Sequence, residues 1–412
     1  MNNNSKFFTE AVSQACPACG YQVAIPFLVG SQQPLATIAW PQSSQAAQDM
    51  EKLPLEFYRC VDCGHVYNHA FSYEVIPYSK KPNLMFNQGV GWSIFIKGVY
   101  RSIFRRLPPQ PTVVEIGHGD GSFLKGLANH CSRGTFIGFD PNSENHQQDN
   151  TEFRREYFDP IKHAAEIKPD LIVSRHVLEH FTNPLGFLQS IAYASRCIGI
   201  EVLAYFEVPC IDQAIESNRT SDFYYEHNSH FTNRSFNKML GKCSDTVLEV
   251  GHGYGGEVVY GIIKLRGDED HLKHVNESYE YQVNARTAHQ TICGQLDELF
   301  NSGLSVCIWG GTGKSAALMN RYGIDAVRFP FVVDSDMNKV GTFVPGTGQQ
   351  ILDRSWLVEN PVQVIIIPTQ WRAHDIFREI TEHNIPYNTI YIEHAGRLVD
   401  YLHDKHPYPV HT

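Results

Sequence analysis

The segment DFYYEHNSHFT, residues 222–232, gathers side chains that can donate, accept or carry protons. Tyr224, Glu226 and His227 lie close together within it. Imidazole titrates near neutral pH, so His227 suits a general base, a role that contributes roughly 10²–10⁴-fold to a rate. A tyrosine hydroxyl can donate a hydrogen bond to an oxygen that gains charge. The alternative is structural, because tyrosine and histidine often link a core to a wet surface.

A glycine-rich turn follows an apolar run in VVEIGHGDGSFLKGLA and precedes an amphipathic helix pattern. The turn contains Glu115, Gly117, Gly119 and Gly121. Such small residues let a ligand approach the backbone closely. Asp140 ends the next apolar run, where it can accept hydrogen bonds from ribose hydroxyls. This pattern resembles the S-adenosylmethionine loop of class I methyltransferases, although a plain cluster of turn glycines is the alternative.

Four cysteines form two Cys-x-x-Cys-Gly knuckles, in CPACG and CVDCG, and they are Cys16, Cys19, Cys60 and Cys63. Each knuckle turns two thiolates toward one point, and four sulfurs complete a tetrahedral shell with no open position. We therefore predict a structural zinc site. The alternatives are two unrelated cysteine pairs or a redox pair, which lacks a thioredoxin-like context here.

The run RHVLEHF spells His-x-x-Glu-His through His176, Glu179 and His180, a pattern found in one class of zinc peptidases. That chemistry needs a sustained helix, whereas here TNP follows at once. We expect these residues at the carboxyl edge of a sheet, facing the cofactor and substrate. His176 is thus a candidate for both cofactor binding and catalysis, and His180 could equally cap or pack.

A second glycine loop, WGGTGKSAAL, resembles a phosphate-binding P-loop, but that motif needs a glycine where Ile308 stands. Gly311, Gly313 and Ala316 instead fit Gly-x-Gly-x-x-Ala after a strand, and Asp334 ends the next strand. The loop either binds part of a nucleotide or is a purely structural turn.

These motifs need a framework that places them together. Four apolar, β-branched runs alternate with helix patterns and predict buried parallel strands over 111–117, 135–140, 170–177 and 198–209. Alternating strands and helices give an open α/β, doubly wound sheet with ligands at its carboxyl edge. Two later β runs with a short turn predict a terminal antiparallel hairpin.

The chain has 412 residues, which exceeds what one core usually holds. We predict three domains: a zinc-binding module over 1–72, the class I methyltransferase sheet over 73–268 and a Rossmann-like α/β domain over 269–412. A net charge of −10 argues against nucleic acid as a partner. No apolar run is long enough to span a membrane, and the N-terminus lacks a signal-peptide pattern, so we expect a cytoplasmic protein with reduced cysteines.

In their shared order these motifs resemble the sugar C-methyltransferases that act on nucleotide-linked 4-keto-deoxy sugars. The resemblance covers almost the whole chain. It rests on CPACG, CVDCG, VVEIGHGDGSF, SRHVLEHFTNP, EVP, YYEHNSHFT, GYGGEV, IWGGTGKSAALMN and KVGTFVPGTG. Two departures are Tyr225, where many members have histidine, and His230, where they have an aromatic residue.

The resemblance implies S-adenosylmethionine as methyl donor, structural zinc and C-3 methylation of the sugar through an enolate. It also implies that Tyr224, Glu226 and His227 are catalytic, with Tyr78 as a substrate-facing hydroxyl. Glu226 would orient the imidazole of His227. The alternatives are methylation of oxygen or another small molecule, and a non-catalytic nucleotide-sugar binding protein. The sequence leaves the sugar, the nucleotide base and the oligomeric state open.

Overall fold

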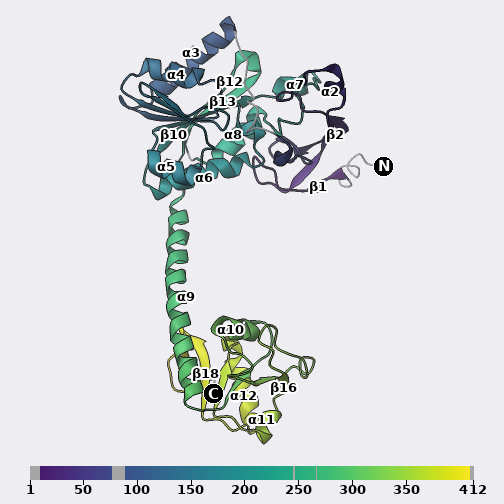
Figure 1. Ribbon diagram of the computed structural model, residues 1–412, viewed down its shortest axis with the longest axis vertical. Coiled ribbons are helices and arrows are strands. Elements are labelled where there is room, and N and C mark those ends of the chain that lie inside the picture. The colour runs from purple at the N-terminus through teal and green to yellow at the C-terminus, as the bar shows by residue number, and fades with distance from the viewer. Residues whose placement is uncertain (1–9, 77–88, 245, 266, 409–412) are drawn as a thin grey trace. The chain divides into compact units, whose positions relative to one another are not determined.

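The computed structural model describes residues 10–76, 89–244, 246–265 and 267–408. The chain divides into two compact units, Met1–Leu272 and Lys273–Thr412 (Figure 1). The first two predicted domains both fall in the first unit, and the three predicted boundaries stay predictions. Among the described residues, no helix has the length and apolar character needed to cross a membrane.

The first unit contains an eight-stranded sheet in the order β12-β13-β10-β9-β5-β6-β8-β7. Its parallel strands are β5 (Thr112–Ile116), β6 (Thr135–Phe139), β8 (Thr151–Arg154), β9 (Leu171–Arg175) and β10 (Val202–Pro209). Its antiparallel strands are β7 (His146–Gln148), β12 (Thr246–Gly253) and β13 (Val258–Leu265). The predicted parallel strands and terminal hairpin are therefore confirmed, and β7 with β8 adds an edge hairpin that was not predicted.

Helices cover both faces of this sheet. On one face, α3 (Val90–Phe104) and α4 (Ser122–His130) share a core with β5 and β9. On the other face, α6 (Pro184–Cys197) and α8 (Asn233–Gly241) share a second core with the same strands. The shorter helices of this unit are α2 (Ser44–Gln48), α5 (Pro160–Ile167), α7 (Asp212–Glu216), η1 (Tyr73–Val75), η2 (Leu178–His180) and η3 (Tyr254–Gly256).

Capping side chains set where the helices near the site begin. The Asn183 side chain accepts the backbone N–H of Gly186, and Pro184 occupies the first turn of α6. TNP therefore starts a helix directly after the short η2 turn. Thr232 and Ser235 form a capping box, so α8 begins as soon as the segment YYEHNSHFT ends.

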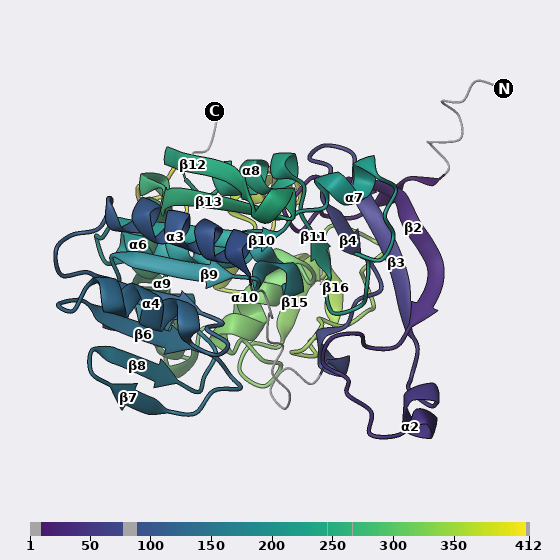
Figure 2. The same ribbon diagram turned by 90° about the horizontal axis from the view of Figure 1, so that it is seen from above.

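A second sheet is formed by strands of the N-terminal module together with a short strand from the segment YYEHNSHFT. Its order is β1-β2-β3-β4-β11, with β1 (Val12–Ser13), β2 (Val23–Gln33), β3 (Leu53–Cys60), β4 (Val66–Asn68) and β11 (Ser229–His230). Figure 2 shows β11 beside β4, to which it pairs antiparallel. The candidate acid–base segment is thus itself an edge strand of the cysteine-bearing sheet.

The second unit is a smaller α/β fold, as predicted. A six-stranded sheet runs in the order β16-β15-β14-β17-β18-β19. Its strands are β14 (Val306–Trp309), β15 (Phe331–Asp334), β16 (Ile351–Asp353), β17 (Val364–Ile367), β18 (Thr389–His394) and β19 (Arg397–Asp400). Its helices are α9 (Glu269–Asn301), α10 (Lys314–Tyr322), α11 (Trp356–Glu359), α12 (Ala373–Glu382) and η4 (Gln370–Arg372).

Alternating side chains of β14 supply the two cores of this unit. Val306 and Ile308 pack with α9 and α10, whereas Cys307 and Trp309 pack with α11 and α12. Every strand from β14 to β18 is parallel to its neighbour, so their carboxyl ends form one edge of the sheet.

Candidate functional site

A cavity opens at the carboxyl ends of β5, β6 and β9. Among the residues that line it are Gly117, Gly119, Asp140, His176 and His180. The first four of these were predicted to bind the cofactor. The cavity lies where open α/β sheets place their ligands, so the predicted cofactor loop and the His-x-x-Glu-His run meet at one site.

The loop owes its shape to glycine and to one carboxylate. Gly117 has a φ of 68°, and a Cβ there would lie 2.4 Å from Cγ2 of Val177. The Gly119 N–H donates to Oδ2 of Asp140 over 3.1 Å, and the Asn142 N–H donates to Oδ1 over 2.8 Å. Asp140 is thereby held at the cavity, with oxygen lone pairs available for ribose hydroxyls.

Two predicted cofactor residues lie behind the loop rather than in the cavity wall. Glu115 is 2% exposed, and burial raises its pKa to about 8 although the charge of Arg175 opposes that rise. Gly121 has a φ of 72°, and a Cβ there would lie 2.6 Å from the ring of Phe153. Both residues shape the loop, while direct cofactor contacts for them stay a prediction.

The candidate acid–base group lies beside this cavity. The Tyr224 hydroxyl is 2.9 Å from Nε2 of His227. The imidazole rings of His227 and His180 have centroids 4.9 Å apart, and His180 lines the cavity. Nδ1 of His180 is 2.7 Å from the backbone oxygen of Glu226, which can only accept. His180 therefore carries a proton on Nδ1 and donates a hydrogen bond to that oxygen.

Electrostatics keep His227 neutral. Burial lowers its pKa well below 6.5, and the nearby imidazoles of His180, His230 and His176 lower it further. Burial also raises the pKa of Tyr224, helped by the charges of Glu179 and Glu226. At neutral pH the pair is thus an uncharged imidazole, which can accept a proton, and an uncharged phenol, which can donate a hydrogen bond. The lowered pKa nevertheless makes His227 a weaker base than the near-neutral imidazole that the sequence predicted.

A buried charge network supports the floor of the site. Glu207 of β10 accepts a hydrogen bond from Arg175 over 2.9 Å and lies 3.0 Å from Nε2 of His176. Nδ1 of His176 is 3.5 Å from Glu179. Despite its burial, the pKa of His176 rises to about 9 because of these two carboxylates, and the pKa of Glu207 falls to about 2. His176 is therefore a cation held between Glu179 and Glu207.

The other side chains of the acid–base segment face the N-terminal module. Oε1 of Glu226 accepts the Thr37 N–H over 2.7 Å and the Thr37 hydroxyl over 3.2 Å. The Tyr225 hydroxyl accepts the Ser72 N–H over 2.9 Å. His230 packs between the rings of Phe57 and Phe223. Glu226 thus anchors the module, and its predicted role beside His227 stays a prediction.

The four predicted zinc ligands come together in this module. The distances from Cys16 to Cys63 and from Cys19 to Cys60 are both 3.7 Å between sulfurs. Zinc–sulfur bonds of about 2.3 Å in a tetrahedron give sulfur–sulfur edges of about 3.8 Å. The Cys63 sulfur also accepts the His65 N–H over 3.4 Å. All four cysteines are buried and unbridged, so ligand type, spacing and surroundings fit zinc.

Sequence reasoning assigned no role to three residues of this site. Arg175 and Glu207 flank the predicted motifs, and EVP contains Glu207, but only the fold shows that they pair. Trp92, whose ring lies 5.4 Å from the Arg175 guanidinium, carries no sequence signal. Tyr78 lies outside the described residues.

Three side chains beside the cavity are of types that bind metal ions. Ligand atoms of Glu179, His180 and His227 lie within 4.8 Å of one another.

Comparison with known protein families gives two matches along the chain. Residues 95–243 match a methyltransferase domain, and residues 257–392 match a C-methyltransferase C-terminal domain. The first covers the glycine loop, the His-x-x-Glu-His run and the acid–base segment, and the second covers most of the second unit. No curated protein is significantly similar in sequence.

Among solved structures, the plantazolicin methyltransferase BpumL in complex with SAH is 17% identical, with a TM-score of 0.31. That alignment covers 42% of this chain and 82% of BpumL. An O-methyltransferase family protein from Burkholderia thailandensis is 13% identical, with a TM-score of 0.30 over 43% of this chain and 56% of that one. Neither likeness bears on the substrate.

The two domain matches agree with what the geometry can do. The glycine loop and Asp140 line a cavity at the carboxyl edge of the sheet, and a histidine next to a tyrosine hydroxyl lies beside it. The methyltransferase domain and the C-methyltransferase C-terminal domain together support an S-adenosylmethionine-dependent methyltransferase, and they are consistent with the sugar C-methyltransferase family.

Proposed function

We propose that the protein methylates a carbon beside the ketone of a nucleotide-linked 4-keto-deoxy sugar, at C-3. The observation that carries the proposal is the neutral imidazole of His227, which lies 2.9 Å from the Tyr224 hydroxyl at the edge of the cofactor cavity. Oxygen methylation needs no α-proton and no enolate stabilisation, so this pair suits carbon better.

In the tautomer of His227 that is protonated on Nδ1, the Tyr224 hydroxyl donates a hydrogen bond to Nε2 in the free protein. When substrate binds, the ketone oxygen takes that hydrogen bond and frees the Nε2 lone pair. His227 then removes the α-proton, and the electron pair of the C–H bond delocalises onto the ketone oxygen. The Tyr224 hydroxyl stabilises this enolate oxygen as it gains charge.

We assign cofactor binding to the loop of Gly117 and Gly119, with Asp140 on the ribose hydroxyls. S-adenosylmethionine, when bound, supplies an electrophilic methyl group on sulfur and leaves as a neutral thioether. Holding the enolate carbon in line with that methyl accounts for up to about 7–11 kcal/mol of barrier reduction. The contacts of Arg175 and His176 with Glu207 tie the loop between β9 and η2 to strand β10.

We assign a structural role to zinc. It would close the two knuckles of the module, whose β4 pairs with the acid–base segment through β11. Asp62, within the second knuckle, accepts a hydrogen bond from Lys238 of α8 over 2.5 Å. The metal thus supports the segment that carries His227 without touching the reacting atoms.

Deuterium exchange tests the reaction class. A 4-keto nucleotide sugar in D₂O should gain deuterium beside the ketone with wild type but not with His227→Ala, and adding S-adenosylmethionine should yield a carbon-bound methyl in the product. His403→Ala, at an exposed histidine 3.0 Å from Asp400, is the matched control. If cofactor binds but neither exchange nor methylation occurs, the substrate class is wrong, and a methyl found on oxygen would favour an O-methyltransferase.

A further inference from the structure

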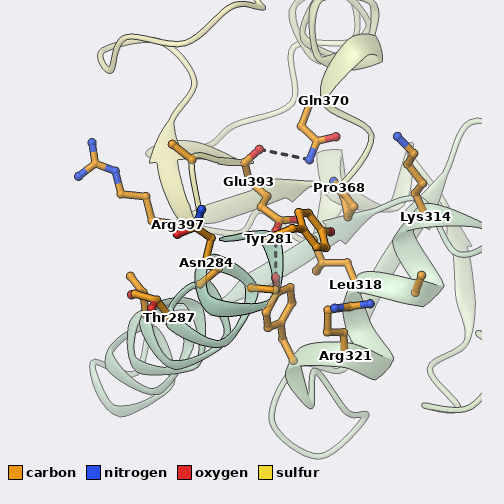
Figure 3. Close-up of a pocket in the computed structure, with 17 residues that line it drawn as sticks. Tyr281, Asn284, Thr287, Lys314, Leu318, Arg321, Pro368, Gln370, Glu393 and Arg397 are labelled. Atoms are coloured by element: carbon orange, nitrogen blue, oxygen red, sulfur yellow. Dashed lines mark hydrogen bonds between the residues drawn. The ribbon is translucent and has the colours of Figure 1, made fainter. Parts of the chain in front are cut away.

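A cavity of about 850 Å³ opens in the second unit (Figure 3). Its walls come from α9, α10, the segment after β17 and the turn between β18 and β19. The connection after β14 leads to β15 on one side, whereas β17 lies on its other side. The carboxyl ends of β14 and β17 thus flank a topological switch point, where open α/β sheets bind ligands. The volume is that of a small-molecule site.

The lining of this cavity is basic. Lys314, Arg321 and Arg397 line it, against a single lining carboxylate, Glu393. Glu393 accepts the Tyr322 hydroxyl over 2.9 Å. Within the described part of the chain, none of the three basic side chains has a carboxylate at ion-pair distance. Nζ of Lys314 lies 4.0 Å from the centroid of the Trp371 ring, which leaves its positive charge without a carboxylate partner. In a protein whose net charge is −10, three cations around one hollow favour an anionic ligand.

The cations are arranged for a ligand with more than one charge. Lys314 and Arg321 are seven positions apart on α10, so they project from the same face two turns apart. In Figure 3 Arg397 lies on the left of the lining residues with its guanidinium directed outward, whereas Lys314 and Arg321 lie on the right. Such a spread suits a diphosphate better than a single carboxylate, because several oxygens can be met at once.

The α9 wall offers a different chemistry. Tyr281, Asn284 and Thr287 follow one another at three-residue spacing and line the cavity from one helix face. The Tyr281 side chain is 72% exposed, which leaves its ring free for a planar group to stack on it. Ala288 and Gly396 also line the cavity, and their small size leaves room beside the three α9 side chains. An aromatic face with amide and hydroxyl neighbours suits a nucleobase and ribose.

We propose that this cavity binds a nucleoside diphosphate, the part of the nucleotide sugar that methylation leaves unchanged. This inference rests on the proposed function for the identity of its ligand. Lys314, Arg321 and Arg397 neutralise the diphosphate, and Tyr281 stacks on the base. The glycine loop before α10 is not the binding device, since its partner Asp334 is buried and engaged by Lys339 over 3.4 Å.

Titration calorimetry on the full chain tests the proposal without any methyl transfer. The probes are the diphosphates of uridine, thymidine, guanosine, cytidine and adenosine, together with inorganic pyrophosphate. We expect at least one nucleoside diphosphate to bind at least tenfold more tightly than pyrophosphate. Lys314→Gln and Arg321→Gln should each weaken that binding roughly ten- to a hundredfold, because each removes a charge-assisted contact.

Tyr281→Ala separates the base from the phosphates: it should weaken the nucleoside diphosphate and leave pyrophosphate unchanged. The control is Arg378→Gln on α12, an exposed arginine 3.7 Å from Glu382, which should change neither. No binding by any nucleotide, or equal binding by the cavity variants, overturns the proposal. Pyrophosphate binding as tightly as every nucleotide also overturns it.

The same samples distinguish this inference from the proposed function. Cavity-dependent nucleotide binding without methyl transfer to any 4-keto sugar would refute the proposed reaction and leave the cavity assignment standing. Methyl transfer to a nucleotide sugar that Lys314→Gln, Arg321→Gln and Tyr281→Ala leave unaltered would refute the cavity assignment alone.

Discussion

The chain contains the same backbone device twice, with different outcomes. In the first unit the Gly119 N–H donates to Oδ2 of Asp140, and in the second the Gly311 N–H donates to Oδ2 of Asp334, both over 3.1 Å. Asp140 lines a cavity, whereas Asp334 is 7% exposed and engaged by Lys339. A glycine loop with an acidic partner therefore indicates a ligand site only where the carboxylate keeps free oxygens toward a hollow.

The largest expected difference between the two loops is in cofactor affinity. Asp140→Asn should weaken S-adenosylmethionine binding roughly ten- to a hundredfold, because charge-assisted hydrogen bonds to ribose are lost. Asp334→Asn should leave that affinity unchanged. Fluorescence or calorimetric titration with the cofactor measures both affinities. Equal losses in the two variants would show that the two loops do not differ in cofactor binding.

The charge network under the first loop predicts pH-dependent stability. Since the folded-state pKa of His176 is about 9, its contribution is complete below pH 6.5 and is lost as pH rises through 9. Glu115, with a folded-state pKa of about 8, adds a loss between pH 4.5 and 8. Together they should lower the free energy of unfolding on the order of 5 kcal/mol between pH 6.5 and 9, at about 1.4 kcal/mol per pKa unit.

Denaturant unfolding of wild type and His176→Gln at several pH values assigns this slope. Between pH 8 and 9 the free energy of unfolding of wild type should still fall as His176 loses its proton. His176→Gln should show a smaller fall there, because the loss through Glu115 is nearly complete by pH 8. Parallel curves for the two proteins across that interval would show that the cation between Glu179 and Glu207 is not the source.

The variant Glu226→Gln tests whether Glu226 anchors the N-terminal module or takes part in catalysis. Its carboxylate accepts two hydrogen bonds from Thr37, so Glu226→Gln should cost about 1–2 kcal/mol of stability through the loss of charged acceptors. The turnover number should change little if anchoring is its main task. A loss of turnover above about a hundredfold at unchanged melting temperature would instead restore the role beside His227 that the sequence predicted.

The smallest effect concerns the second loop. Lys339→Met removes the cation beside Asp334, and because the lysine is partly exposed the cost should be below about 1 kcal/mol. Methyl transfer should not change. Differential scanning calorimetry, with the exposed Lys405→Met as control, can resolve this shift. A large loss of activity would mean that the second loop serves the reaction directly.

The sequence predicted most of the fold because β-branched runs and glycine turns are local signals. It predicted both glycine loops, but it could not distinguish Asp140 from Asp334. The contact between Lys339 and Asp334, which makes them different, depends on how the chain folds after β15. It assigned Glu226 to His227 because they are adjacent, whereas Thr37, its partner, is 189 positions away. The sequence did not indicate that Gly121 also makes room for the ring of Phe153, because that contact comes from a strand later in the chain.

The pairing of β11 with β4 has a consequence for recombination between related enzymes. β11 pairs with β4 next to the second knuckle, and Lys238 of the following helix α8 forms an ion pair with Asp62 of that knuckle. Strands β5 to β10 separate these two segments in sequence. A chimera that exchanges one without the other would join mismatched halves of a single sheet. The two segments should therefore be inherited, or transplanted, as a unit.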